Sequence, residues 1–92
     1  MMNVENRVDR VDWDVILEKS VMQKSVIDFS LGLLSRDDFY NYSIFIGVGP
    51  YVRKLIRNNS VQNARKLARK ALKRRGILNK NNLTNPRVYA QL

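Results

Sequence analysis

The stretch ARKLARKALKRRG, residues 64–76, decides the fold because its side chains separate onto two sides of a helix. Between Arg65 and Arg75 it carries seven positive charges in eleven positions and no acidic residue. At 100° per residue, the apolar side chains of residues 61–75 occupy an arc of about 140°. They are Val61, Ala64, Leu67, Ala68, Ala71 and Leu72. The pattern predicts an amphipathic helix whose apolar arc packs against other helices.

The side of this predicted helix opposite the apolar arc is basic, and we expect it to be displayed to solvent. Its side chains are Arg65, Lys66, Arg69, Lys70, Lys73 and Arg74. Arg75 falls back toward the apolar edge. Ser60 or Asn59 is the expected N-cap and Gly76 ends the helix, which therefore covers residues 61–75. Because the apolar arc contains Leu and Ala rather than Trp and Phe, it fits docking on helices better than insertion into lipid.

A long helix is predicted near the N-terminus, over residues 11–34, and is expected to be buried along most of its circumference. Asp12 or Asp14 suits its first turn, where the helix dipole favours an acid. Trp13 precedes the periodic apolar run and is expected to pack on the core. The periodic positions are Val15, Met22, Val26, Phe29 and Leu33, with Ile16, Ile27 and Leu34 in a second row.

The next predicted helix runs through DDFYNYSIFIG, residues 37–47. Ser35 and Asp38 have the spacing of a capping box, with Asp in place of the usual Glu. Helical aromatic side chains usually fill a core, so Phe39 and Phe45 are expected to be buried. For the two tyrosines of this helix, the sequence is consistent with either core packing or base stacking.

The motif GVGP, residues 47–50, is expected to break the helix, because glycine permits unusual backbone angles and Pro50 suits a first helical turn. A further helix is predicted over YVRKLIRNN, residues 51–59, with inward-facing Val52, Leu55 and Ile56. Its basic side chains are Arg53, Lys54 and Arg57. We expect these three to widen the basic face into a patch. The glycines do not indicate a phosphate-binding loop, because the P-loop ending Gly-Lys-Ser/Thr and the strand of a dinucleotide fingerprint are both missing.

The chain length of 92 residues suits one small domain with a single core. We predict an N-terminal arm over residues 1–10, a helical domain over residues 11–76 and a basic, asparagine-rich tail over residues 77–92, which contains Pro86. The expected fold is all-α: a compact bundle of three to four helices, with a basic C-terminal amphipathic helix and a short extended tail.

Charge divides the chain into two electrically different parts. All eight acidic residues lie in residues 1–38, where five Lys and Arg leave a balance of −3. Residues 39–92 hold twelve Lys and Arg and no acid, a balance of +12 that brings the whole chain to +9. Such asymmetry indicates a nucleic acid or another anionic partner, because solubility alone does not require the exclusion of acids.

Several function classes fit poorly with this composition. The chain has no histidine and no cysteine, so the usual imidazole bases, thiolate nucleophiles and transition-metal ligands are missing. We therefore expect no enzymatic activity, no catalytic residues, no metal site and no cofactor. The N-terminus has no apolar segment typical of a secretory signal, and no apolar run approaches the length of a membrane span. A soluble, intracellular protein is the expectation.

The hypothesis that fits the basic residues best is non-catalytic binding of DNA or RNA through phosphate-backbone contacts, as a regulator or a structural component of a nucleoprotein assembly. The predicted site consists of Arg65, Lys66, Arg69, Lys70, Lys73, Arg74, Arg53, Lys54 and Arg57. The basic helix has no turn where a helix-turn-helix motif needs one. Zinc-finger ligands and the glycine-aromatic pattern of an RNA-recognition motif are also missing.

The alternative is a protein-binding adaptor or inhibitor that docks its basic face on an acidic surface of a larger enzyme or complex. The acidic first third offers a second surface of opposite sign, which would also support a homo-oligomer. Binding to a membrane surface is a third hypothesis. The ten asparagines among 92 residues are typical of AT-rich genomes, such as those of viruses, organelles or low-GC bacteria.

Overall fold

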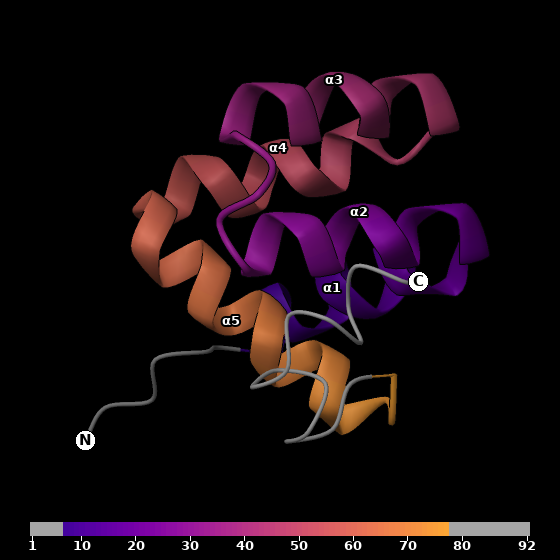
Figure 1. Ribbon diagram of the computed structural model, residues 1–92, viewed down its shortest axis with the longest axis vertical. Coiled ribbons are helices and arrows are strands. Elements are labelled where there is room, and N and C mark those ends of the chain that lie inside the picture. The colour runs from indigo at the N-terminus through magenta and orange to yellow at the C-terminus, as the bar shows by residue number, and fades with distance from the viewer. Residues whose placement is uncertain (1–6, 78–92) are drawn as a thin grey trace.

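Five α-helices make up residues 7–77, the part of the chain that this computed structural model describes (Figure 1). They are α1 (Arg7–Glu18), α2 (Ser20–Ser30), α3 (Arg36–Ile46), α4 (Gly49–Asn58) and α5 (Val61–Arg74). No strand occurs within these residues, so the all-α prediction is confirmed. The number of helices differs from the predicted three to four. The expected tail lies outside the described residues except for Ile77.

The extra helix arises because the predicted long helix is divided at Lys19. This residue adopts an extended conformation, with φ −84° and ψ 110°, and separates α1 from α2. A straight helix with apolar side chains around most of its circumference would leave some of them in water. The break instead lets Ile16 of α1 and Met22 of α2 enter the same core. Leu33, expected inside, lies beyond the end of α2 and is 65% exposed.

The N-terminal boundary also differs from the expectation. Helix α1 begins at Arg7, inside the segment 1–10 that the sequence predicts as an arm. Trp13 of α1 is fully buried, which confirms its assignment to the core. Its ring lies 6.3 Å from that of Phe39 on α3. Phe39 in turn stacks on Phe29 of α2 at 4.5 Å, so three helices meet in one aromatic cluster.

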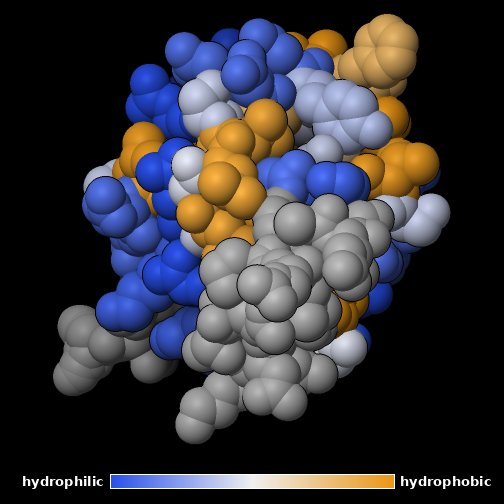
Figure 2. All heavy atoms as spheres, in the orientation of Figure 1, coloured by the Kyte–Doolittle hydropathy of each residue, from blue (hydrophilic) through white to orange (hydrophobic). Residues whose placement is uncertain are grey.

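Helix α3 is capped as the sequence predicts. The Ser35 hydroxyl accepts a hydrogen bond from the Asp38 backbone N–H at 3.1 Å. Phe39 is buried as expected, but the prediction for Phe45 is wrong, because its side chain is 87% exposed. Six helical positions rotate a side chain by about 240°, so the two phenylalanines face different directions. Figure 2 shows apolar groups gathered at the upper right, over the C-terminal end of α3.

The GVGP motif breaks the chain between α3 and α4, as predicted. Gly47 ends α3 with a φ of 97°, a left-handed conformation that favours glycine. A Cβ atom on Gly49 would lie 2.9 Å from Ile44 Cγ1 and 3.2 Å from Ile44 Cα. Glycine at this position therefore permits the close approach of the two helices. Pro50 lies in the first turn of α4, where its missing N–H is harmless.

Helix α5 packs against α2 and α1. Its N-cap is Ser60, whose hydroxyl accepts a hydrogen bond from the Asn63 backbone N–H at 3.1 Å. The helix ends at Arg74, one residue before the predicted end, and Arg75 is its C-cap. Val61 is half-buried at the first turn. The fully enclosed side chains are Ala64, Leu67, Ala68, Ala71 and Leu72.

The two phenylalanines of α3 provide a matched test of this packing. We expect Phe39→Ala to lower the free energy of unfolding by about 3–5 kcal/mol, because it removes a buried ring from the aromatic cluster. Phe45→Ala should change it by less than about 0.5 kcal/mol, because its ring is already in water. Urea denaturation followed by circular dichroism measures both. Equal losses for the two variants would show that α3 is rotated about its axis.

Candidate nucleic-acid interface

The outer face of α5 carries a line of three exposed lysines: Lys66, Lys70 and Lys73. Their spacing of four and three residues places them on one side of the helix. At 1.5 Å per residue, the line is about 10 Å long. No acidic residue occurs in α4 or α5. We call these three residues the lysine line.

Arg65 lies beside the lysine line but contacts the protein instead of projecting freely into solvent. Its Nε donates a hydrogen bond to the Phe29 carbonyl oxygen at 3.0 Å, and its Nη2 donates to the Leu34 carbonyl oxygen at 3.3 Å. The guanidinium carbon also lies 5.2 Å from the centre of the Phe29 ring, within the range of a cation–π contact. Arg65 therefore attaches α5 to the end of α2.

Arg69 makes the same kind of contact one turn later. Its Nη1 donates a hydrogen bond to the backbone carbonyl oxygen of Ser30, the last residue of α2. The final carbonyl groups of a helix have no partner within the helix and form the negative end of its dipole. Two arginines from α5 thus satisfy carbonyl groups at the C-terminal end of α2, and both are half-buried.

The helical wheel explains the inward contacts of the arginines at the two edges of the apolar arc, Arg65 and Arg74. Arg65 lies about 20° from Leu72, at one edge of the apolar arc, and Arg74 lies about 20° from Leu67, at the other edge. Lys66 and Lys73 lie near the middle of the basic side, whereas Arg69 and Lys70 each lie about 60° from the nearer apolar edge. A long side chain at the edge of an apolar arc reaches the neighbouring helix, whereas one in the middle does not. Position on the wheel thus separates Arg65 and Arg74 from Lys66 and Lys73, but it does not distinguish Arg69 from Lys70.

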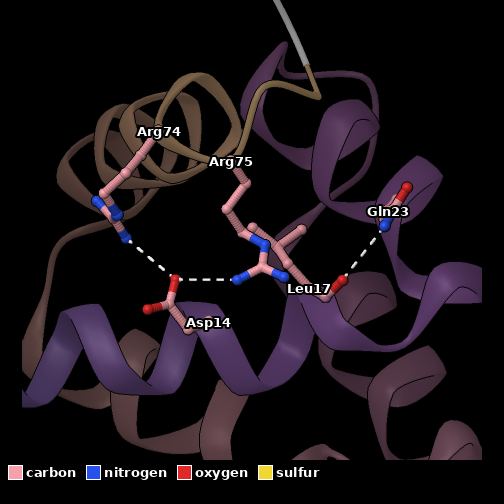
Figure 3. A network of polar contacts seen from close by, with 5 residues as sticks. All are labelled: Asp14, Leu17, Gln23, Arg74 and Arg75. Carbon is pink, nitrogen blue, oxygen red and sulfur yellow. Dashed lines mark hydrogen bonds and ion pairs between the residues drawn. The ribbon is translucent and has the colours of Figure 1, made fainter.

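Arg74 and Arg75 both approach Asp14 of α1 (Figure 3). Arg74 Nη2 lies 3.5 Å and Arg75 Nη1 lies 3.6 Å from the same carboxylate oxygen, Asp14 Oδ1. Figure 3 also shows the side-chain amide of Gln23 donating to the Leu17 carbonyl oxygen at 3.3 Å, across the break between α1 and α2. The C-terminal end of α5 is therefore partly neutralised by α1.

The three basic side chains of α4 are all exposed, and two of them lie near other helices. Lys54 Nζ lies 3.9 Å from Oδ1 of Asp12, a buried residue of α1. Arg53 lines a groove between α3 and α4. Arg57 lies in the last turn of α4. The widening of the basic face of α5 by these three residues stays a prediction.

An open hollow of about 530 Å³ lies at the start of α5. Its lining residues are Ser60, Gln62, Asn63, Lys66 and Arg69. Two of them have side-chain amides that can donate hydrogen bonds to an anionic oxygen. Lys66 thus stands between this polar hollow and the remainder of the lysine line.

Other kinds of site are not supported by the described residues. Among them, no group of three or more His, Cys, Asp or Glu side chains is placed to hold a metal ion. None of the described helices has the length and apolar content needed to cross a membrane. No protein-family model, curated protein or solved structure matches this chain.

Two neighbouring positions on α5 test the distinction between structural and displayed cations. Arg69→Met keeps much of the side-chain length but removes the hydrogen bond to Ser30, so we expect it to lower the free energy of unfolding by about 1.5 kcal/mol. Lys70→Met should leave that free energy within about 0.5 kcal/mol of the parent. Thermal and urea denaturation measure both. If Arg69→Met were as stable as the parent, the contact with α2 would have no structural role.

Proposed function

We propose that this protein binds nucleic acid without catalysing a reaction, and that α5 is its basic amphipathic binding helix. The observation that carries this proposal is the lysine line: three exposed lysines on one helix face, in a region without acids. The arginines at both edges of this face contact α2 and α1. The lysines are thus the charges of α5 most available to an external anion.

The dimensions of the lysine line suit a phosphate backbone. The line presents three ammonium groups over about 10 Å, each on a flexible stem that can reach a separate phosphate of a nucleic-acid backbone. Lysine presents a compact charge to phosphate without a fixed hydrogen-bonding fork. Such contacts position a protein on the backbone and carry no sequence information. The proposal therefore covers DNA and RNA, with the protein as a regulator or a structural component of a nucleoprotein assembly.

The composition of the line also weighs against the alternative of docking on an acidic protein. Lysine is depleted at protein–protein interfaces, where arginine is enriched. On α5 the arrangement is the reverse, because Arg65 and Arg69 bind backbone carbonyl groups of the same chain. The exposed lysines therefore suit a nucleic-acid backbone, which carries many phosphate charges, better than single carboxylates of a partner protein.

The lysine line costs the free protein some stability. Lys66 and Lys70 are four residues apart, as are Lys70 and Arg74, and like charges at this spacing destabilise a helix by about 0.2–0.5 kcal/mol per pair. A polyanion on this face would remove the repulsion. The repulsion between these lysines weakens the free helix, and a bound anion would reduce it. This arrangement supports a role in binding rather than in stability.

Salt dependence is the direct test of the proposed contacts. We expect the affinity for a mixed-sequence DNA duplex, measured by fluorescence anisotropy, to fall with sodium chloride with a log–log slope of about −3. Lys66→Ala should reduce the magnitude of that slope by about 1, because one phosphate contact is lost. The absence of binding at low salt, or a slope near zero, would overturn the proposal.

Charge reversal in the middle of the line should separate binding from folding. We expect Lys70→Glu to weaken duplex binding strongly while it raises the free energy of unfolding by about 0.5 kcal/mol, because repulsion at two pairs becomes attraction. Lys19→Glu makes the same change in net charge at an exposed position outside α5. Anisotropy and thermal melts should show the control binding much more tightly than Lys70→Glu. Equal loss of affinity in both variants would point to net charge alone.

A further inference from the structure

A groove of about 280 Å³ lies between α3 and α4, away from the lysine line. It is lined by Tyr40, Ile44, Gly47, Gly49, Pro50 and Arg53. Small-molecule sites usually measure about 300–1,000 Å³, so this groove is closer in size to a pocket for one large side chain.

Both glycines of the GVGP motif line this groove together with Ile44 and Pro50. A Cβ atom on Gly49 would lie only 2.9 Å from Ile44 Cγ1, so the backbone at this position contacts Ile44 directly. Val48, between the glycines, is buried in the core and fixes the turn below. The shape of the groove therefore depends on Gly49, and any larger residue at this position would change it.

The chemistry of the lining is apolar with one cationic edge. Ile44 is 52% exposed, an unusual position for a large aliphatic side chain, and Pro50 is also exposed. Phe45 adds apolar surface at the same end of α3. Arg53 is the one charged residue of the lining. The acids of α3, Asp37 and Asp38, lie in the first turn of that helix and are not part of the lining.

We propose that this groove binds an acidic amphipathic segment of a partner protein, with one large apolar side chain in the groove and a neighbouring carboxylate on Arg53. Charge complementarity selects the acidic partner, because Arg53 is the one charged residue of the lining. Ile44 and Pro50 favour an apolar side chain over a nucleobase, because the hydrogen-bonding edges of a base would find no partner on them. Tyr40, the aromatic residue of the lining, is half-buried. Docking of an apolar helix face into a groove is a common mode of peptide recognition.

This surface is separate from the one proposed for nucleic acid. The groove is built by α3 and α4, whereas the lysine line belongs to α5. The protein would therefore join a nucleic acid to an acidic protein segment through two faces. Each face can fail its own test without affecting the other.

Selection of a random peptide phage library on the full-length protein tests the proposal. We expect enriched peptides to carry a large apolar residue within one helical turn of Asp or Glu. Binding of a synthetic enriched peptide, measured by fluorescence anisotropy, should weaken about tenfold or more in Arg53→Glu and in Ile44→Ser. Lys19→Glu, with the same charge change as Arg53→Glu, should bind the peptide as the parent does. Circular dichroism establishes that each variant remains folded.

Several results would overturn the proposal. One such result is a library that yields no enriched peptides, or only peptides without an excess of acidic residues. Another is that both groove variants bind the peptide as tightly as the parent does. Displacement of the peptide by a single-stranded oligonucleotide from the parent and equally from Lys70→Glu would make the groove a nucleotide site. Sedimentation of the parent as a dimer that Arg53→Glu dissociates would make a second copy of the chain the occupant.

Discussion

The stack of Arg65, Phe29, Phe39 and Trp13 is the interaction on which the fold depends, because its four members come from α5, α2, α3 and α1. The three rings are fully buried, and the guanidinium group closes the stack on the α5 side. Arg65 also binds two carbonyl groups near the end of α2, which fixes the direction of its side chain. Together with the buried apolar arc of α5, this stack fixes the position of the helix and therefore of its outer face.

The two kinds of cation on α5 have different relations to the fold. Arginine has a planar fork with five donors, which suits it to two carbonyl groups and an aromatic face at once. Lysine has a single ammonium group on a flexible stem, and the lysines of the line face water. One short basic stretch therefore has two roles. Its arginines bind other helices of the bundle, and its lysines are exposed to solvent.

Much of α5 could be predicted from sequence because a 3.6-residue period ties each side chain to a direction. The same rule, applied to distances from the apolar edge, separates Arg65 and Arg74 from Lys66 and Lys73, but not Arg69 from Lys70. The break at Lys19 could not be predicted, because periodicity continues through it and no glycine or proline marks it. The exposure of Phe45 does not follow from its aromatic character, because helical phase turns it about 240° away from the buried Phe39. The groove depends on the distance between two helices, which no local pattern contains.

The division between arginine and lysine on α5 has a consequence for covalent chemistry. Acetylation acts on amines and removes their charge, whereas a guanidinium group is not a substrate for it. Modification of the three exposed lysines would discharge the outer face of α5 and leave the arginine contacts to α2 untouched. The anion binding proposed for this face would then be lost and regained through reversible modification, with the contacts between α5 and α2 kept throughout.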